Sequence, residues 1–284
     1  VEFSKIGIVG AGTMGRRLAH LIVRKTESTV RLHDVAPDAL ARAERYHAKE
    51  LEKLAKRGKL GDNDFESMTE RLVIVDTLDA LCCSDLVLTA VVEDLDTKKE
   101  VFRQLDQCVS TDTILATCTS ALSVTSLAAA VEESHRVIGL HFFNPPQIIR
   151  LVEIVRGIET SDDVFDRAYQ FCHDLGKETI VSLDTPGFST SRLAAVLINE
   201  AIYELHEGVA SADDIDRGMK LGYDMPMGPL ALADLIGLDV LLSILDTLQK
   251  DYGDTKYRPC ILLRKKVESG QLGRKTGSGF FEYA

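Results

Sequence analysis

The sequence predicts an α/β fold in which a doubly wound, largely parallel sheet is followed by an all-α C-terminal domain. A short apolar run at 5–9 leads directly into a glycine-rich motif at 10–15 and then into an apolar helical pattern. Strand-like and helix-like segments alternate as far as residue 185, which is typical of a parallel sheet covered by helices. Almost every segment after residue 185 has the periodicity of a helix.

The glycine-rich motif has the spacing of a dinucleotide-binding βαβ unit. Gly10 permits the tight turn after the strand, Gly12 lets backbone amides approach a pyrophosphate, and Gly15 lets the helix pack closely on the strand. Thr13 and Met14 begin the helix, whose unpaired amides attract phosphate. The motif therefore predicts a Rossmann-type cofactor site formed by these five residues.

Asp34 selects between the two nicotinamide cofactors. It ends the apolar run 29–33, where a carboxylate accepts both ribose hydroxyls of NAD and repels the 2′-phosphate of NADP. The next residues, 35–37, supply no compensating cation. The sequence therefore predicts NAD as the cofactor, and the alternative is a solvent-exposed loop acid.

Length and composition limit the class of protein. The 284 residues favour two domains, and the net charge of −11 argues against general nucleic-acid binding. The sequence contains no apolar run of about 18 residues, so we expect no membrane span. It opens directly into a predicted strand, so we expect no signal peptide. The six cysteines lack zinc-ligand spacing. They indicate reduced, mostly buried thiols in a cytoplasmic protein, and no metal site is expected.

The alternation of elements defines two domains, 1–185 and 186–284. We expect the first to bind NAD and the second to contact substrate and to form a homodimer. The break falls at 185–187, where proline and glycine follow one another. The first domain has predicted strands at 72–75, 85–92, 113–117 and 136–140, and predicted helices at 36–60, 95–108 and 122–131. The second has predicted helices at 188–207, 211–222, 229–250 and 258–269.

His141 is the main candidate for the group that handles the proton in a nicotinamide-dependent reaction. It follows the apolar run 137–140, at the carboxyl end of a predicted strand, where doubly wound sheets bind ligands. Glu153 stands inside another apolar run, 148–155, where an unpaired carboxylate is costly to bury. We expect the two to pair, so that the carboxylate fixes the imidazole tautomer. The alternative for His141 is a packing role.

Two further features of the sequence are candidate substrate contacts, namely Ser120 and a basic helix end. Ser120 follows the predicted strand 113–117, where a hydroxyl can hydrogen-bond a substrate oxygen, although serine is ordinary at such positions. Lys53, Lys56 and Arg57 form a basic cluster in an acidic protein. The cluster is either a contact for a phosphorylated substrate or a solvated helix end, where cations suit the helix dipole.

Longer motifs extend along nearly the whole chain. They include GAGTMG (10–15), VVEDLDTKKEVF (91–102), TSALS (119–123), GLHFFNPP (139–146), LVEIVRG (151–157), DTPGF (184–188), DIDRGMKLGYDMPMGPLALADLIGLD (214–239) and GRKTGSGFFEY (273–283). These strings resemble those of the short-chain 3-hydroxyacyl-CoA dehydrogenases, which include the bacterial 3-hydroxybutyryl-CoA dehydrogenases. The resemblance implies reversible hydride transfer between NAD and C3 of an acyl thioester in fatty acid metabolism.

The resemblance also implies roles for single residues. His141 matches the catalytic base, Glu153 its paired acid, and Ser120 the serine that hydrogen-bonds the 3-oxygen of the substrate. Glu93 and Lys98 match residues that line the nicotinamide end of the cofactor site. The segment containing Lys53, Lys56 and Arg57 matches the one that meets the CoA nucleotide.

Six positions depart from the family pattern, and they are Ser191, Cys118, Ala121, Thr89, Ala231 and Glu50. Ser191 stands where the family has an asparagine that helps place the substrate carbonyls, and Cys118 and Ala121 replace a second asparagine and a serine. Serine does not offer the donor and acceptor pair of an amide. Besides an active 3-hydroxyacyl-CoA dehydrogenase, two other interpretations therefore stay open. The enzyme acts on an acyl carrier protein thioester or a free 3-hydroxy acid, or the chain binds NAD with little turnover.

Overall fold

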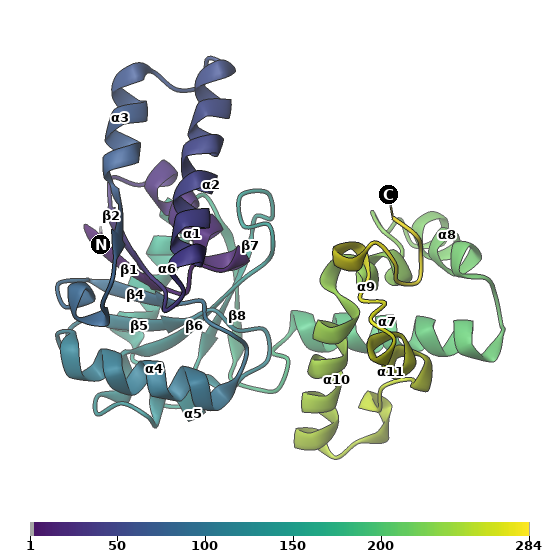
Figure 1. The fold of residues 1–284 in the computed structure, drawn as a ribbon. Coiled ribbons are helices and arrows are strands. Elements are labelled where there is room, and N and C mark those ends of the chain that lie inside the picture. The colour runs from purple at the N-terminus through teal and green to yellow at the C-terminus, as the bar shows by residue number, and fades with distance from the viewer. Residues whose placement is uncertain (1–2, 284) are drawn as a thin grey trace. The chain divides into compact units, whose positions relative to one another are not determined.

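The computed structural model describes residues 3–283, apart from the side chain of Asp62 (Figure 1). The chain divides into two compact units between Asp184 and Thr185. The first unit contains one mixed sheet covered by helices, and the second is built from helices. The predicted combination of a doubly wound α/β domain and an all-α domain is confirmed.

The sheet of the first unit has eight strands in the order β3-β2-β1-β4-β5-β6-β7-β8. Neighbouring strands are parallel except β6 and β7, which are antiparallel. That reversal at β6–β7 places two catalytic candidates opposite each other. The strands are β1 (Lys5–Val9), β2 (Thr29–His33), β3 (Leu72–Val75), β4 (Leu86–Thr89), β5 (Ile114–Thr117), β6 (Val137–Phe142), β7 (Leu151–Arg156) and β8 (Glu178–Leu183).

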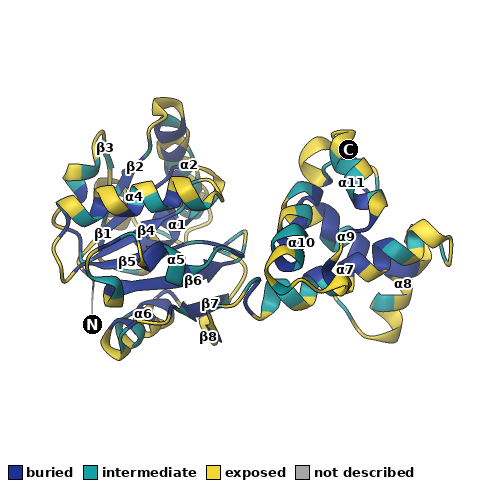
Figure 2. Cartoon of the chain, turned by 90° about the horizontal axis from the view of Figure 1, so that it is seen from below, coloured by how far each residue is buried: buried dark blue, intermediate teal, exposed yellow. Residues whose placement is uncertain are grey.

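Helices cover both faces of this sheet, and the central strands between them are buried (Figure 2). The apolar side chains of β1, β4 and β6 point into one continuous core, in which Ile6, Leu88 and Ile138 are fully buried. A hairpin of α2 and α3 extends beyond the sheet (Figure 1). The helices are α1 (Thr13–Lys25), α2 (Pro37–Lys56), α3 (Asp62–Glu70), α4 (Leu95–Cys108), α5 (Val124–Ala128) and α6 (Asp162–Asp174).

The second unit depends on two buried acids that bind backbone amides. Asp234 accepts hydrogen bonds from the amides of Phe280 and Phe281, each at 2.9 Å, and from the Tyr283 hydroxyl at 3.0 Å. Only glycine fits at Gly279, because a Cβ there would lie 1.9 Å from Asp234 Oδ1. The C-terminal motif at 273–283 is therefore a structural element. The helices of this unit are α7 (Thr190–Glu207), α8 (Ala212–Gly222), α9 (Pro229–Ile236), α10 (Leu238–Tyr252) and α11 (Ile261–Glu268).

The second buried acid, Asp216 of α8, accepts hydrogen bonds from the amides of Leu230 and Ala231, at 2.8 and 2.9 Å. These amides belong to the first turn of α9, where helical backbone leaves donors unpaired. A Cβ at Gly228 would lie 2.2 Å from Asp216 Cγ, so only glycine admits the carboxylate. The 214–239 motif thus has a folding role.

Two sequence predictions need correction. The cysteines are all unpaired, but the expectation that they are mostly buried is wrong, because Cys82 and Cys83 are exposed and Cys108 and Cys118 half-buried. The single helix predicted at 229–250 is two helices, since Gly237 between them has a φ of +104°. None of the helices within the described residues has both the length and the apolar character needed to cross a membrane.

Candidate active site

His141 and Glu153 form a buried pair on neighbouring antiparallel strands. The register of β6 and β7 places the two residues directly opposite each other, so both side chains lie on the same face of the sheet. His141 Nδ1 lies 3.1 Å from Glu153 Oε2. The histidine is 5% exposed and the glutamate is fully buried. The pairing that the sequence predicts is therefore present.

Ser182 of β8 is the second partner of Glu153 and was not predicted from the sequence. Its hydroxyl donates to Glu153 Oε1 at 2.5 Å. In the parallel register of β7 and β8, Glu153 lies opposite Ile180, and Ser182 is two residues further along on the same face. The one sequence signal was a hydroxyl inside an apolar stretch. Because a carboxylate only accepts hydrogen bonds, His141 Nδ1 is assigned as the protonated ring nitrogen.

The loop that follows β6 is fastened on both sides. The Phe143 ring lies 4.4 Å from the His141 ring between centroids, so the loop position constrains the imidazole. Lys177, buried at the start of β8, donates to the carbonyl oxygens of Pro146 and Ile149, the latter at 2.8 Å. Burial, followed by the charge of Lys25, lowers the pKa of Lys177.

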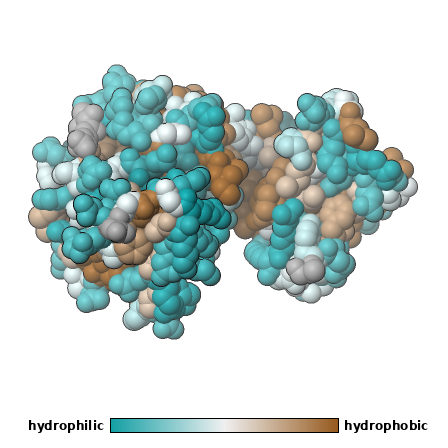
Figure 3. Space-filling view, turned by 90° about the horizontal axis from the view of Figure 1, so that it is seen from above, coloured by the Kyte–Doolittle hydropathy of each residue, from teal (hydrophilic) through white to brown (hydrophobic). Residues whose placement is uncertain are grey.

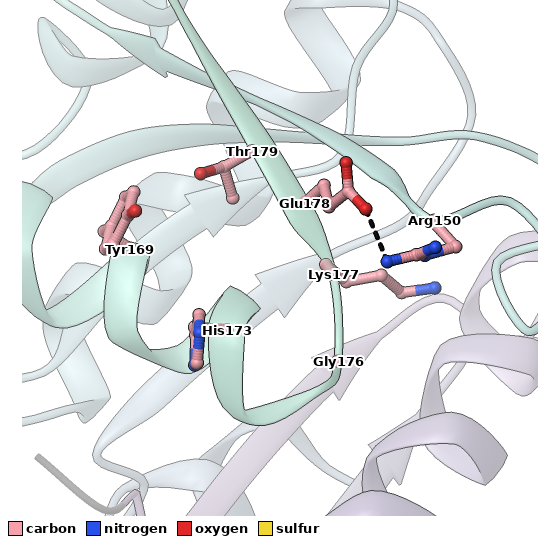
Figure 4. Close-up of a pocket in the computed structure, with 7 residues that line it drawn as sticks. All are labelled: Arg150, Tyr169, His173, Gly176, Lys177, Glu178 and Thr179. Atoms are coloured by element: carbon pink, nitrogen blue, oxygen red, sulfur yellow. Dashed lines mark ion pairs between the residues drawn. The ribbon is translucent and has the colours of Figure 1, made fainter.

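A surface cavity of about 480 Å³ adjoins Lys177 at the start of β8 (Figure 4). Arg150 and Glu178 form an ion pair on its wall. The predicted catalytic residues do not line this cavity. The lining consists of Arg150, Tyr169, His173, Gly176, Lys177, Glu178 and Thr179.

Ser120 lies in the loop after β5, and an ion pair between the buried Lys98 and the partly exposed Glu93 anchors that loop. Lys98 Nζ lies 2.9 Å from Glu93 Oε2 and donates to the Cys118 carbonyl oxygen at 2.6 Å. Glu93 Oε1 accepts from the Ser120 amide at 2.8 Å and from the Thr119 hydroxyl. Glu93 and Lys98 therefore fix the backbone that carries the Ser120 side chain.

The electrostatics of this anchor keep Glu93 ionised. Burial alone would raise the pKa of Glu93, but the charge of Lys98 and the hydrogen bonds from Thr119 and Ser120 lower it below its usual value. Burial also raises the pKa of the neighbouring Cys118 thiol to about 12. Cys118 thus contributes a neutral S–H group at the edge of the Ser120 loop.

The glycine-rich loop has the shape that a dinucleotide requires. Gly10 has a φ of +103°, and a Cβ on it would lie 2.6 Å from the Ala90 carbonyl oxygen. A Cβ on Gly15 would lie 1.7 Å from the Gly10 carbonyl oxygen, whereas one on Gly12 would meet nothing within 4 Å. No side chain caps the N-terminus of α1 at Thr13. The open space at Gly12 and the uncapped amides fit a pyrophosphate.

Asp34 is half-buried at the carboxyl end of β2 and holds the glycine-rich loop. Its Oδ2 accepts from the Ala11 amide at 2.6 Å, and its Oδ1 accepts from the Ala36 amide at 2.8 Å. Each carboxylate oxygen has a second lone pair, so the side chain can still accept two ribose hydroxyls. The carboxylate therefore fits an NAD ribose while it fixes the loop.

The predicted basic cluster lies at the far end of α2, in the projecting hairpin (Figure 1). Lys53 pairs with Glu50 at 2.5 Å, and Lys56 lies 3.9 Å from Glu52. Arg57 caps the C-terminus of the helix. Acids on the same helix therefore neutralise part of the positive charge that the sequence predicts there.

Ser191 belongs to the second unit, where it lies half-buried in the first turn of α7. The next residue, Arg192, donates to the hydroxyls of Tyr257 and Tyr252 at 2.8 and 3.0 Å, and its guanidinium lies 4.5 Å from the Tyr252 ring centroid. These contacts fasten the start of α7 to the end of α10 and so fix the position of Ser191 within its unit.

Comparison with known proteins identifies the family of this chain. A family model described as the NAD binding domain of 3-hydroxyacyl-CoA dehydrogenase matches residues 5–185, and one described as the C-terminal domain matches residues 187–283. The chain belongs to the 3-hydroxyacyl-CoA dehydrogenase family. The resemblance that the sequence motifs predict is confirmed.

Three relatives illustrate the similarity. The probable 3-hydroxybutyryl-CoA dehydrogenase of Bacillus subtilis is 42% identical over 283 residues, which cover 100% of this chain and 98% of that protein. The 3-hydroxybutyryl-CoA dehydrogenase of Bradyrhizobium diazoefficiens is 42% identical over 98% of this chain and 95% of its own. The crystal structure of (S)-3-hydroxybutyryl-CoA dehydrogenase from Ralstonia eutropha superposes with a TM-score of 0.94 at 40% identity, over 100% of both chains.

Proposed function

We propose that this chain catalyses reversible hydride transfer between NAD and C3 of a 3-hydroxyacyl-CoA thioester of the 3-hydroxybutyryl-CoA type. Family membership makes the chain an NAD-dependent oxidoreductase of 3-hydroxyacyl-CoA substrates. The observation that supports the site assignment best is a pair of buried hydrogen bonds. Glu153 accepts one from His141 and the other from Ser182.

Bound NAD supplies the hydride acceptor, so the protein must take the hydroxyl proton. We assign this proton to Nε2 of His141, because Nδ1–H is directed at Glu153. Glu153 keeps the imidazole in the tautomer that can accept a proton, and its charge stabilises the imidazolium that results. In the reverse direction, the same Nε2–H returns the proton to the 3-oxygen.

The remaining catalytic positions orient the substrate. The Ser120 hydroxyl donates to the 3-oxygen, and the Glu93–Lys98 pair holds the loop that presents it. Ser191 stands where the family pattern has an asparagine that helps place the substrate carbonyls, and we propose that its hydroxyl takes this role. Glu93 and Lys98 also line the nicotinamide end of the cofactor site in this proposal.

Cofactor and carrier contacts follow from the loop geometry and the charges. Gly10, Gly12, Thr13, Met14 and Gly15 hold the cofactor phosphates, because the uncapped amides of α1 lie there. Asp34 holds the adenosine ribose and makes NAD the preferred cofactor. At the far end of α2, Lys53, Lys56 and Arg57 contact the CoA nucleotide.

A second candidate function is the same reaction on an acyl carrier protein thioester or on a free 3-hydroxy acid. The neutral, half-buried Cys118 thiol and the apolar Ala121 favour it, because both lie near Ser120 where the family pattern is polar. Ser191→Asn separates the candidates. In a pocket of the ordinary family type, the restored amide raises kcat/KM for acetoacetyl-CoA several-fold, because it adds one hydrogen bond to the transition state. In a pocket rebuilt for another substrate, it lowers kcat/KM or leaves it unchanged.

We also propose a homodimer in the cytoplasm. The second unit exposes large apolar side chains, and Figure 3 shows such side chains on its surface. Leu193, Leu221 and Tyr223 are 71%, 80% and 77% exposed. Burying residues of this kind between two copies would remove them from water, and light scattering of the purified chain tests the assignment.

The decisive test of the function is NADH oxidation by the purified chain with three thioesters: acetoacetyl-CoA, acetoacetyl-pantetheine and the acetoacetyl carrier protein. We expect turnover with acetoacetyl-CoA and a higher KM for the pantetheine thioester. Turnover with the carrier protein alone would favour the second candidate. If the chain binds NADH but turns over none of the three thioesters, both enzymatic candidates fail, and the result supports an NAD-binding protein with little turnover.

A further inference from the structure

Two guanidinium groups lie together between α1, α2 and the loop that follows His141. Arg17 Nη1 donates to Asn144 Oδ1, and the Arg16 guanidinium lies 5.5 Å from the centroid of the Tyr46 ring. Gln147 Nε2 donates to the Tyr46 hydroxyl at 3.0 Å and to the Arg17 carbonyl oxygen at 3.1 Å. The cluster is therefore a built polar site, held by two helices and the active-site loop.

The positive charge of this cluster has no carboxylate partner. Arg16 and Arg17 are half-buried, and the Nε atom of each is buried without a hydrogen-bond acceptor. Within the described residues, no carboxylate lies within 4.0 Å of the charged nitrogens of either arginine. Three other arginines also have a buried, unsatisfied Nε, but each pairs with an acid: Arg71 with Glu27, Arg136 with Asp106 and Arg167 with Asp163.

The surroundings leave the cluster positive. Glu50 lies one helical turn beyond Tyr46 on α2, but Lys53 pairs with it at 2.5 Å. Burial, followed by the charge of Glu50, raises the pKa of Tyr46, so its hydroxyl remains a donor. Arg16 and Arg17 are cations without a carboxylate partner, and the Tyr46 hydroxyl can donate beside them. In a protein of net charge −11, such a group of donors suits an anionic ligand with several oxygen acceptors.

We propose that Arg16, Arg17 and Tyr46 form a subsite for the phosphate at the end of the pantetheine arm of the substrate. The inference rests on the proposed function, since it assumes a thioester substrate. Through Asn144 the subsite contacts the loop that follows His141, and Tyr46 lies about two helical turns before Lys53 on α2. It therefore lies on the path from the reacting acyl end to the nucleotide end of CoA.

This location explains how one site can serve two carriers. CoA and an acyl carrier protein share the pantetheine arm and the phosphate attached to it, but only CoA carries the nucleotide that the Lys53 cluster would meet. Arg16 and Arg17 recognise the shared phosphate, and their planar donors match its oxygens. The other source of the same chemistry is the diphosphate of NAD, because Gly15 directly precedes Arg16.

The test compares Arg16→Gln, Arg17→Gln and the double variant with Arg24→Gln, an exposed arginine further along the same helix. KM is measured with acetoacetyl-CoA, acetoacetyl-4′-phosphopantetheine and acetoacetyl-pantetheine, and the Kd of NADH is measured by fluorescence. We expect the double variant to raise KM about tenfold for the two phosphate-bearing thioesters. The KM for acetoacetyl-pantetheine, the Kd of NADH and the Arg24→Gln variant stay within twofold of wild type.

Two results would overturn the inference. An equal rise in KM with all three thioesters would show that the arginines only support the fold or the loop. A weaker Kd of NADH, with KM unchanged, would assign them to the cofactor diphosphate. Calorimetric binding of free CoA keeps the test separate from the proposed function, because it needs no turnover. If wild type turns over no thioester but the double variant binds CoA about tenfold more weakly, the phosphate subsite stands and the proposed reaction fails.

Discussion

Replacing Glu153 by glutamine removes one negative charge and almost no volume. The carboxylate is fully buried and contacts His141 Nδ1 at 3.1 Å and the Ser182 hydroxyl at 2.5 Å. A glutamine amide can face the imidazole with its oxygen and Ser182 with its NH₂, because a serine hydroxyl accepts as well as donates. We therefore expect Glu153→Gln to fold and melt within a few degrees of wild type.

The catalytic cost follows from the charge. A hydrogen bond to a charged group contributes about 1.5–3 kcal/mol, and in this site it is strongest when His141 carries the proton taken from substrate. Losing that amount from the transition state lowers kcat about 10–150-fold. Binding of the ground state involves a neutral imidazole, so KM and the Kd of NADH change by less than about twofold.

The assay is steady-state NAD reduction with 3-hydroxybutyryl-CoA, the direction in which a neutral His141 takes the proton, with Ser182→Ala as the matched control. Ser182→Ala keeps the carboxylate charge and removes one hydrogen bond, so its kcat falls less than that of Glu153→Gln. The double variant falls by less than the product of the single effects, because both act through the same carboxylate. A Glu153→Gln enzyme with kcat within twofold of wild type would refute the role assigned to the buried pair.

Three further predictions concern other parts of the structure. Because of Asp34, the wild-type enzyme should have a kcat/KM with NADH at least about tenfold higher than with NADPH. Asp34→Asn should lower that ratio. Equal kcat/KM with both cofactors in the wild type would contradict the assignment. Burial, followed by His47, lowers the pKa of His20 from 6.5 to about 4, so the unfolded chain binds a proton there that the folded chain excludes. The unfolding free energy in urea should accordingly fall by about 2 kcal/mol from pH 7 to pH 5, and His20→Gln should reduce that slope. Asp234→Ala leaves three hydrogen-bond donors without their acceptor, so it should destabilise the second unit by about 3 kcal/mol in thermal melts. The Kd of NADH should not change.

Elements with a local signal were predicted well from the sequence. The strand at Leu72–Val75 and the helix at Leu95–Cys108 have the predicted bounds, because an isolated apolar run and an amphipathic pattern each define one element. The prediction of one helix at 229–250 was wrong, because the chain breaks into two helices at Gly237. A glycine within an apolar helical pattern does not reveal that its φ is positive. The helices α3 and α6 and the strand β8 were not assigned from the sequence.

The site shows the same division between local and non-local information. His141 and Glu153 could be proposed as a pair because a buried carboxylate needs a partner nearby. Ser182 and Lys177 could not, because their contacts depend on β8 lying beside β7. The roles of Arg16 and Arg17 depend likewise on α1, α2 and the loop after β6 meeting in space.

The central claim is that His141 handles the proton of an NAD-dependent hydride transfer. It is tested most directly by the kcat of His141→Ala for NADH oxidation with acetoacetyl-CoA, measured together with the Kd of NADH. The account predicts a kcat lowered by about 10²–10⁴, the span of a lost general acid–base group, and a Kd of NADH within twofold of wild type. Near-full activity of His141→Ala would show that another group moves the proton and would contradict the account.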